Sequence, residues 1–395
     1  ALDDRQRAGA LVWAVHEALV KAGAPDAAVA FAGLRDGAPR LRLAGGVIAA
    51  GVLELVLAGP AAIALVRLTE AGAGRVTHYS RDIEMTFREA LPPLGSPTAP
   101  VFFAWMGALR EEAMADSRAA LARAFGEEGK GMVTNGTRLR IPQPVRFAAR
   151  LRAWVWLERV LASHPSTFEL GFQWAETDPK GAPRRIVAQG RQRLTWVEVG
   201  AGGHVAAAPF PDFFADFIAR RQPPAGAGPF TPPLGHLPAH AGDEPLVWRR
   251  DPGANRGWGE ARVALETDES HSNLVGNIYF SHAAVLAERA CQKLLRALGS
   301  APGGFFATAL RLDHSGEAMP GDVLEARARL VEVRASGFET RPYCAIHLTL
   351  VNQSQGGAVI ATGLARYGLF AAGGEGSAPL PLPGWLIPGQ ARAAL

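Results

Sequence analysis

The sequence predicts an α+β protein built mainly from two diverged copies of one unit, each an antiparallel sheet wrapped round one long helix. An order of one strand, one helix and four further strands occurs in residues 76–199 and again in residues 246–370. The segment between them, 200–245, is dense in Gly and Pro and is predicted to be a linker with a short helix over 210–221. The repeated order β-α-β-β-β-β therefore sets the domain organisation.

Hydrophobic periodicity places the elements of each copy. The first copy is predicted to have a strand over 76–87, a helix over 101–124, and strands over 132–141, 147–161, 166–176 and 184–198. The second copy is predicted to have a strand over 261–266, a helix over 278–298, and strands over 305–313, 321–334, 338–352 and 357–370. Apolar and polar residues alternate in these strands, which is typical of antiparallel strands that bury one face and expose the other.

The two helices also correspond residue by residue. The aromatic start of the first, 101–103, matches 278–280 in the second, and at the same offset Glu111 matches Glu288. Two copies of one folding unit explain this correspondence.

The flanking regions are predicted separately. Residues 1–75 are expected to form a small α/β region, with helices over 5–22 and 47–57 and strands over 27–33, 39–43 and 61–68. The run 46–66 is apolar, but Glu54 lies in its middle and Gly and Pro interrupt it, so a membrane span is not expected. The tail, 371–395, is rich in Gly and Pro and is expected to lie irregularly over the surface.

Composition excludes several classes of function. The net charge is +4 and the sequence has no Lys/Arg block, which argues against nucleic-acid binding. Cys291 and Cys344 allow at most one disulfide and no cysteine-based metal site. The start of the sequence lacks a secretion signal, so a cytoplasmic protein is expected. Phosphate-loop, dinucleotide, Gly-x-Ser-x-Gly and His-x3-Gly-x4-Pro signatures are missing, and no metal is expected.

The most informative segment is 266–289, in which a polar strand end passes through the turn 273–276 into an apolar, aromatic-led helix. This segment resembles the helix entry of hotdog-fold thioesterases. The wording Asn-Leu-Val-Gly-Asn-Ile-Tyr over 273–279 is most similar to the acyl-carrier-protein thioesterases of enediyne polyketide pathways. The resemblance implies a tandem double hotdog, with the active site between the turn of one copy and the helix of the other. It implies thioester hydrolysis on acyl-CoA or an acyl carrier protein, with a polyketide-type or fatty-acid-type acyl group.

The resemblance and the residue chemistry together nominate a site. Asn273 is expected to stabilise an oxyanion or to orient water, together with the backbone amides at the helix start, although Asn also suits a helix cap there. The other catalytic candidates are Glu288, Glu111 and His282. Substrate-binding candidates are Gly276, Asn277, Tyr279, Arg289, His271, Asp268 and, from the first copy, Trp105. No cofactor is implied, because the substrate is expected to be carried as a pantetheine thioester of CoA or of a carrier protein.

Some features depart from the family that the segment resembles. The tyrosine and the arginine that follow the asparagine in that family are replaced here by Ala283 and Cys291. The charges of 110–112 also suit a solvated helix face. In the first copy the equivalent turn, 91–100, offers only Ser96, which predicts one functional and one degenerate site.

Three other activities are compatible with the residues: acyl transfer or decarboxylation by a double hotdog, acyl-thioester binding without catalysis, and dehydration. A homodimer is also compatible. Acyl chain length, the choice between CoA and carrier protein, and the role of residues 1–75 are left open by the sequence.

Overall fold

The computed structural model describes residues 28–35, 38–44, 51–56, 65–69, 77–91, 93–199, 205–222, 230–237, 259–272, 277–299, 301, 303–334, 341–371 and 378–386. The chain divides into two compact units, 1–76 and 77–395. Each unit is considered separately.

The described part of the first unit is a four-stranded antiparallel sheet in the order β1-β2-β3-β4. The strands are β1 (Ala28–Arg35), β2 (Ala38–Ala44), β3 (Gly51–Val56) and β4 (Leu65–Thr69). The helix predicted over 47–57 is wrong, because β3 pairs with β2 on one side and β4 on the other. The predicted α/β character is thus replaced by β structure where the unit is described, and the helix predicted over 5–22 lies outside the described residues.

The second unit contains both copies. The first copy consists of β5 (His78–Ile83), α2 (Ala99–Ala113), α3 (Arg118–Gly126), β6 (Lys130–Arg140), β7 (Leu151–Val160), β8 (Thr167–Thr177) and β9 (Pro183–Val199). The second copy consists of β11 (Glu260–Glu266), α5 (Phe280–Leu298), β12 (Gly304–His314), β13 (Val323–Arg334), β14 (Tyr343–Asn352) and β15 (Ala358–Phe370). Both copies therefore have the predicted order of elements.

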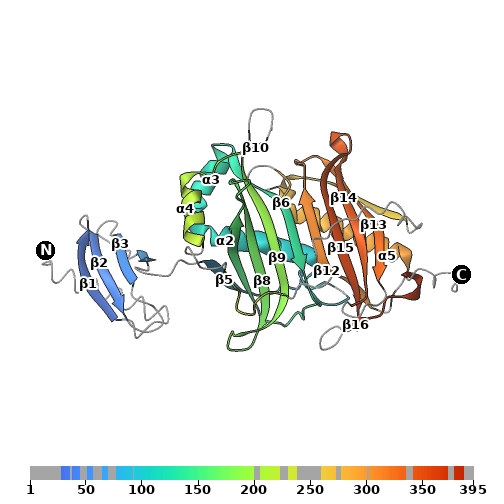
Figure 1. Cartoon of the computed structure of the whole chain (residues 1–395), viewed down its shortest axis with the longest axis horizontal. Coiled ribbons are helices and arrows are strands. Elements are labelled where there is room, and N and C mark those ends of the chain that lie inside the picture. Colours follow the sequence, from blue (N-terminus) through green and yellow to red (C-terminus); the bar gives the residue numbers. More distant parts are fainter. Residues whose placement is uncertain are drawn as a thin grey trace. The chain divides into compact units, whose positions relative to one another are not determined.

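All the described strands of this unit belong to one 12-stranded antiparallel sheet. Its order is β11-β13-β14-β15-β12-β6-β9-β8-β7-β5, so each copy contributes five consecutive strands and β6 joins β12 at the centre. Figure 1 shows the two halves of the sheet side by side, with α2 and α5 packed against it. No described helix is long and apolar enough to cross a membrane.

The central junction has an internal twofold register. Arg140 pairs with Ala309, and Gly136 pairs with Asp313, so each pair is the mirror of the other when the copies are exchanged. The register shift after Thr134 in β6 has its counterpart after Ala307 in β12. Equivalent positions in the two copies can therefore be compared directly.

The helix predicted over 101–124 is interrupted. The residue after α2, Met114, has non-helical backbone angles (φ −103°, ψ 16°), and Ala115–Ser117 form a short 3₁₀ turn, η1, before α3 begins. Asp116 and Ser117 favour such a break, because their side chains compete for backbone hydrogen bonds. The break lets α3 turn back against β6, where it forms one wall of the cavity described below.

The linker and the tail contain more structure than their composition indicates. The predicted helix in the linker is confirmed as α4 (Asp212–Arg221), and β10 (Val205–Ala207) pairs with β9. In the tail, β16 (Pro379–Leu380) pairs with β15, and Leu382 and Leu386 are buried in the main core. The expectation of an irregular surface tail is therefore wrong for residues 379–386, which cover apolar surface.

Candidate functional site

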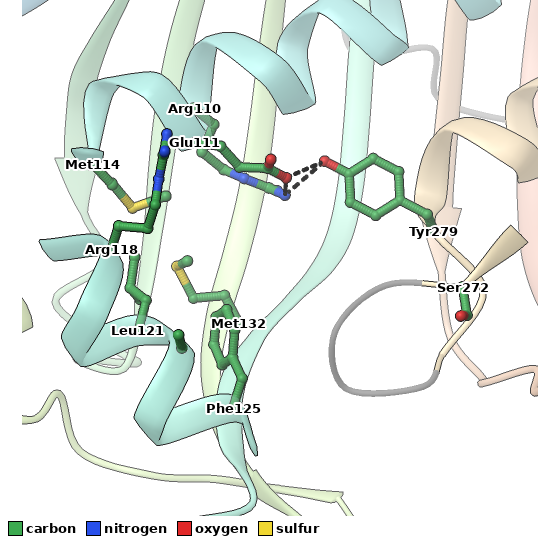
Figure 2. Close-up of a pocket in the computed structure, with 10 residues that line it drawn as sticks. Arg110, Glu111, Met114, Arg118, Leu121, Phe125, Met132, Ser272 and Tyr279 are labelled. Atoms are coloured by element: carbon green, nitrogen blue, oxygen red, sulfur yellow. Dashed lines mark hydrogen bonds and ion pairs between the residues drawn. The ribbon is translucent and has the colours of Figure 1, made fainter. Parts of the chain in front are cut away.

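Three polar side chains from the two copies meet at the junction of α2 and α5. The Tyr279 hydroxyl donates to Glu111 Oε1 over 2.9 Å and accepts from Arg110 Nη2 over 3.1 Å. Figure 2 shows Arg110 and Glu111 pointing from α2 towards Tyr279, which lies just before α5. The cluster thus combines a cation, a carboxylate and a phenol, which are the groups used to polarise a carbonyl and to move a proton.

Backbone hydrogen bonds hold Tyr279 in place. The Tyr279 amide donates to the His271 carbonyl over 2.8 Å, and Ser272 forms an isolated bridge with Ile278. Ser272 and Ile278 therefore lie side by side on antiparallel segments just before α5. Asn273 and Gly276 lie outside the described residues, so their roles stay predictions.

Arg110 is buried, contrary to the solvated face expected for 110–112. Its side chain is 9% exposed, and its Nη1 donates to the buried Gln192 side chain over 3.1 Å. Its guanidinium also lies 5.5 Å from the centre of the Phe280 ring. The side chain of Glu111, in contrast, is 61% exposed, so its carboxylate can reach water. The pKa of Tyr279 is raised to about 12, chiefly by burial, which keeps its hydroxyl protonated as a hydrogen-bond donor.

Gly107 provides the space for the Tyr279 hydroxyl. A Cβ added at Gly107 would overlap the Tyr279 hydroxyl oxygen. The equivalent position in the second copy is Ala284, and the residue equivalent to Tyr279 in the first copy is Phe102, which has no hydroxyl. The absence of a side chain at Gly107, in the first copy, thus makes room for the phenol of Tyr279, in the second copy.

Gly107→Ala is expected to lower enzymatic turnover, because the added methyl group displaces the Tyr279 hydroxyl from Glu111 and Arg110. The change favours the helix by roughly 1 kcal/mol, which offsets part of the roughly 1–3 kcal/mol that overpacking costs, so the variant should still fold. Steady-state kinetics together with a thermal melt check the prediction. Unchanged turnover in the folded variant would contradict the role given to the position of the hydroxyl.

Two cavities meet at this cluster. The first, of about 580 Å³, is lined by Arg110, Glu111, Met114, Arg118, Leu121, Ala122, Phe125, Met132, Ser272 and Tyr279. The second, of about 490 Å³, shares Arg110, Met132 and Tyr279 with the first. Figure 2 shows the side chains of Leu121, Phe125 and Met132 from α3 and β6 beside the polar cluster. The first cavity is therefore largely apolar and open to the polar cluster at one end.

The two matched glutamates have different surroundings. Glu111 contacts Tyr279, whereas Glu288 accepts from the Tyr367 hydroxyl over 2.5 Å and from Gln292 over 2.9 Å. Burial raises the pKa of Glu288. Glu288 does not line either cavity, so the structure brings only Glu111 to the cluster.

The other predicted residues are distributed round the turn. Asp268 accepts from the Ser270 amide and from His271 Nδ1, each over 2.8 Å, and the His271 ring lies edge-on to His282 at 4.9 Å. Burial, followed by the charge of His271, lowers the pKa of His282. These side chains form a cluster beside the turn, and they are not among the described residues that line the two cavities.

Three further candidates complete the comparison. Asn277 lines the second cavity. Arg289 is exposed on α5 and lines neither cavity. Trp105 is buried, and its indole nitrogen donates to Glu89 Oε1 over 2.8 Å, so it is also not among the lining residues. Among the described residues, no group of three or more His, Cys, Asp or Glu side chains could hold a metal ion.

Several residues of the site were not foreseen. Arg110 and Gln192 belong to the first copy, and Asn135, His314 and Glu317 line the second cavity. Ala283 and Cys291 stand where the family that the segment resembles has a tyrosine and an arginine. In this structure a tyrosine and an arginine, Tyr279 and Arg110, come together from different copies. The sequence signal for Arg110 is its place on an otherwise apolar helix face beside Met106, although this does not identify its partners.

The equivalent position in the other half is filled. Phe102 replaces the tyrosine there, is fully buried, and lies edge-on to Trp105 and Trp174. The turn before α2 packs against β12, since a Cβ added at Gly304 would contact the Leu94 side chain. This half therefore has neither the phenol nor the free approach that characterises the Tyr279 cluster.

Alkaline titration is expected to distinguish the folded from the unfolded chain. The sequence has four tyrosines, Tyr79, Tyr279, Tyr343 and Tyr367, and burial raises the pKa of each. The folded pKa values lie above the unfolded value of about 10. The contribution of the protonated tyrosines to the stability of the fold is therefore complete below about pH 10 and is lost as the pH rises through the folded values. Phenolate absorbance should therefore appear at a higher pH in the native protein than in the denatured one. Coincident curves would contradict the burial described.

Comparisons with known proteins agree with this architecture. Residues 275–341, within the second copy, match the family model described as "Thioesterase superfamily". The structure is similar to the 12:0-ACP thioesterase from Umbellularia californica, with 10% identity, a TM-score of 0.50, and coverage of 74% of this chain and 94% of that chain. It is similar to the putative oleoyl thioesterase from Lactobacillus plantarum, with 10% identity, a TM-score of 0.50, and coverage of 75% and 97%.

A weaker likeness, with a TM-score of 0.36 and 13% identity over 71% of this chain and 83% of the other, is to RV0216 from Mycobacterium tuberculosis, described as a double hotdog fold. The sequence matches none of the curated proteins with which it was compared. Residues 77–395 thus have the predicted tandem double hotdog fold, and the second copy carries the thioesterase-superfamily match.

Proposed function

We propose that this chain processes acyl thioesters of coenzyme A or of an acyl carrier protein, most simply by hydrolysis, at the cluster of Tyr279, Glu111 and Arg110. The observation that carries the proposal is the meeting of these three side chains across the two copies, at one end of a largely apolar cavity. The thioesterase-superfamily match over 275–341 includes Tyr279 and supports the same chemistry.

The first requirement is polarisation of the thioester carbonyl. Arg110 is held by Gln192, and Tyr279 stays protonated, so both can donate to an oxygen placed between them when the Tyr279 hydroxyl turns from Glu111 to the substrate. Donors that already lie beside the reacting oxygen stabilise the negative charge that develops on it. Asn273 and the amides at the start of α5 are proposed as additional donors, in keeping with the sequence-based prediction.

The second requirement is a nucleophile. Glu111 is exposed to water while it contacts Tyr279, so it is suited to orient a water molecule and accept its proton. The water oxygen then forms a bond to the carbonyl carbon, the carbon–sulfur bond breaks, and the thiolate that leaves takes the proton that Glu111 accepted from the water. The products are a carboxylic acid and a free thiol.

The first cavity is suited to the acyl chain. Its lining residues Met114, Leu121, Phe125 and Met132 are apolar, and burial of each methylene group contributes about 0.8 kcal/mol. Water access at Glu111 favours hydrolysis over transfer of the acyl group to a second thiol. Dehydration has no support from a specific residue here, and a purely binding role would leave the Tyr279 cluster unexplained.

The test is a panel of acyl-CoA and acyl-carrier-protein thioesters of different chain lengths, scored for free thiol and for acyl transfer. Hydrolysis is expected with an apolar acyl group. Acyl-carrier product without free thiol would replace hydrolysis by transfer, and acyl binding without either product would contradict catalysis altogether.

A further inference from the structure

We infer that the second cavity, which shares Tyr279 with the first, is a hydrogen-bonding subsite for a neutral polar segment of the substrate, recognised by His314 and by Asn135, which Thr195 holds in place. This inference rests on the proposed function, since the cavity shares Arg110 and Tyr279 with the proposed catalytic cluster. It assigns to the two cavities different parts of one substrate.

The lining of the second cavity is rich in uncharged polar groups. Thr134, Asn135, Thr195, Asn277, His314 and Ser315 all line it. Asn135 Oδ1 accepts from the Thr195 hydroxyl over 2.6 Å, which leaves the Asn135 amide group as a donor. His314 Nε2 is buried and has no hydrogen-bond partner in the described structure. A buried polar atom without a partner is costly, and a ligand that bonds to it would remove that cost.

The twofold register relates this cavity, beside Tyr279, to the corresponding region beside Phe102, and the polar residues differ between the two. The twofold register at β6 and β12 makes Asn135 equivalent to Thr308, the residue at the matching register shift. Ile141, which follows β6, and His314, the last residue of β12, are equivalent as well. We call the half with Phe102 the closed half and the half with the Tyr279 cluster the open half. Ile141 is fully buried, so the closed half has an apolar side chain where the open half has an imidazole.

Thr195 also lacks a polar equivalent in the second copy. Val133 pairs with Thr195 in the first copy and its equivalent, Phe306, pairs with Gly368 in the second. Three polar side chains therefore line the cavity where their equivalents are Thr308, Gly368 and Ile141. Packing of the common fold does not require the Thr195 hydroxyl or the His314 imidazole, because the equivalent positions are Gly368 and Ile141.

The chemistry of the lining indicates a neutral occupant. The ionisable side chains of the lining are Arg110, Tyr279, His314 and Glu317, and Arg110 is already bonded to Gln192 and Tyr279. Burial favours the uncharged forms of His314 and Glu317. Amide, hydroxyl and ketone groups, which both donate and accept or only accept, match this lining better than a phosphate or an alkyl chain. The two sources of such groups are the amides of the pantetheine arm and an oxygenated acyl chain.

The residues of the closed half provide conservative test variants. Asn135→Thr and His314→Ile each introduce the side chain that the same fold accommodates at the equivalent position. Thr308→Asn is the control, because it makes the reverse change in the half without the Tyr279 cluster. The substrates are decanoyl-CoA, 3-hydroxydecanoyl-CoA and the decanoyl thioester of N-acetylcysteamine, which lacks most of the pantetheine arm.

Loss of a neutral hydrogen bond is expected to raise KM about three- to tenfold in each variant, with a smaller effect on kcat. If the pantetheine arm occupies the cavity, KM rises for both CoA thioesters and not for the truncated one. If an oxygenated acyl chain occupies it, KM rises for the 3-hydroxy substrate alone. Equal changes for all three substrates, no change, or a similar effect of Thr308→Asn would overturn the inference.

Binding measurements separate this inference from the proposed function. Calorimetric titration with pantetheine and with 3-hydroxydecanoate requires no turnover. The wild-type protein could fail to hydrolyse any thioester while Asn135→Thr and His314→Ile bind either ligand more weakly than the wild type does. That result would uphold the subsite and contradict the proposed reaction. Unchanged binding of both ligands in correctly folded variants would contradict the subsite even if hydrolysis is observed.

Discussion

Glu111→Gln is expected to lower thioester turnover by roughly 10²- to 10⁴-fold, because an amide cannot accept the proton of the attacking water. Glutamine has nearly the same shape and can still accept a hydrogen bond from Tyr279, so the geometry of the cluster should persist. The side chain of Glu111 is 61% exposed, and the substitution should therefore have little effect on folding. Steady-state turnover of an acyl-CoA, with a thermal melt of each protein, provides the measurement.

The matched control is Glu288→Gln. Glu288 occupies the equivalent position in α5, but it bonds to Tyr367 and Gln292 in the core and lines neither cavity. Its amide variant should retain turnover. If Glu288→Gln abolished activity and Glu111→Gln did not, the assignment of the two glutamates would be reversed.

Tyr279→Phe is expected to reduce kcat by roughly 10²- to 10³-fold, the usual effect of removing one preorganised donor to an oxyanion. The ring and its packing against Phe280 are retained, so the loss should arise from the hydroxyl alone. Phenylalanine is also the residue at the equivalent position of the closed half, Phe102, which shows that the fold accepts it.

Kinetics with one acyl-CoA at saturating and subsaturating concentrations measure this effect. A change confined to KM would indicate that Tyr279 binds substrate without stabilising the transition state. Wild-type values of both constants would remove Tyr279 from the mechanism. The control is Tyr367→Phe, which deletes a buried phenol that lies away from both cavities and should alter stability more than turnover.

Most of the fold was accessible from the sequence because its signals are local. Alternation within strands, the apolar face of α5 and the breaker-rich linker each depend on neighbouring residues. The helix predicted over 47–57 failed for the opposite reason. Residues 51–56 become a strand because β2 and β4 provide hydrogen-bonding partners on both sides, and a short apolar run does not by itself distinguish a helix from a strand.

The site was less accessible because its contacts join distant residues. Tyr279 and Glu111 were named from the motif and from the repeat, but Arg110 was not among the candidate site residues. Its hydrogen bond to Tyr279 spans 169 positions in the chain, so no local pattern reveals it. Asn135 and His314 carry no motif, and only the twofold register shows that their equivalents are Thr308 and Ile141.

The central claim is that one catalytic site per chain lies between the copies at Tyr279. The most direct measurement is a crystal structure of the Glu111→Gln variant bound to an unhydrolysed acyl-pantetheine thioester. We expect one ligand per chain, with its carbonyl oxygen within hydrogen-bonding distance of Arg110 and Tyr279 and its alkyl chain against Leu121 and Phe125. A ligand bound instead beside Phe102, or a thioester distant from Tyr279, would contradict the claim.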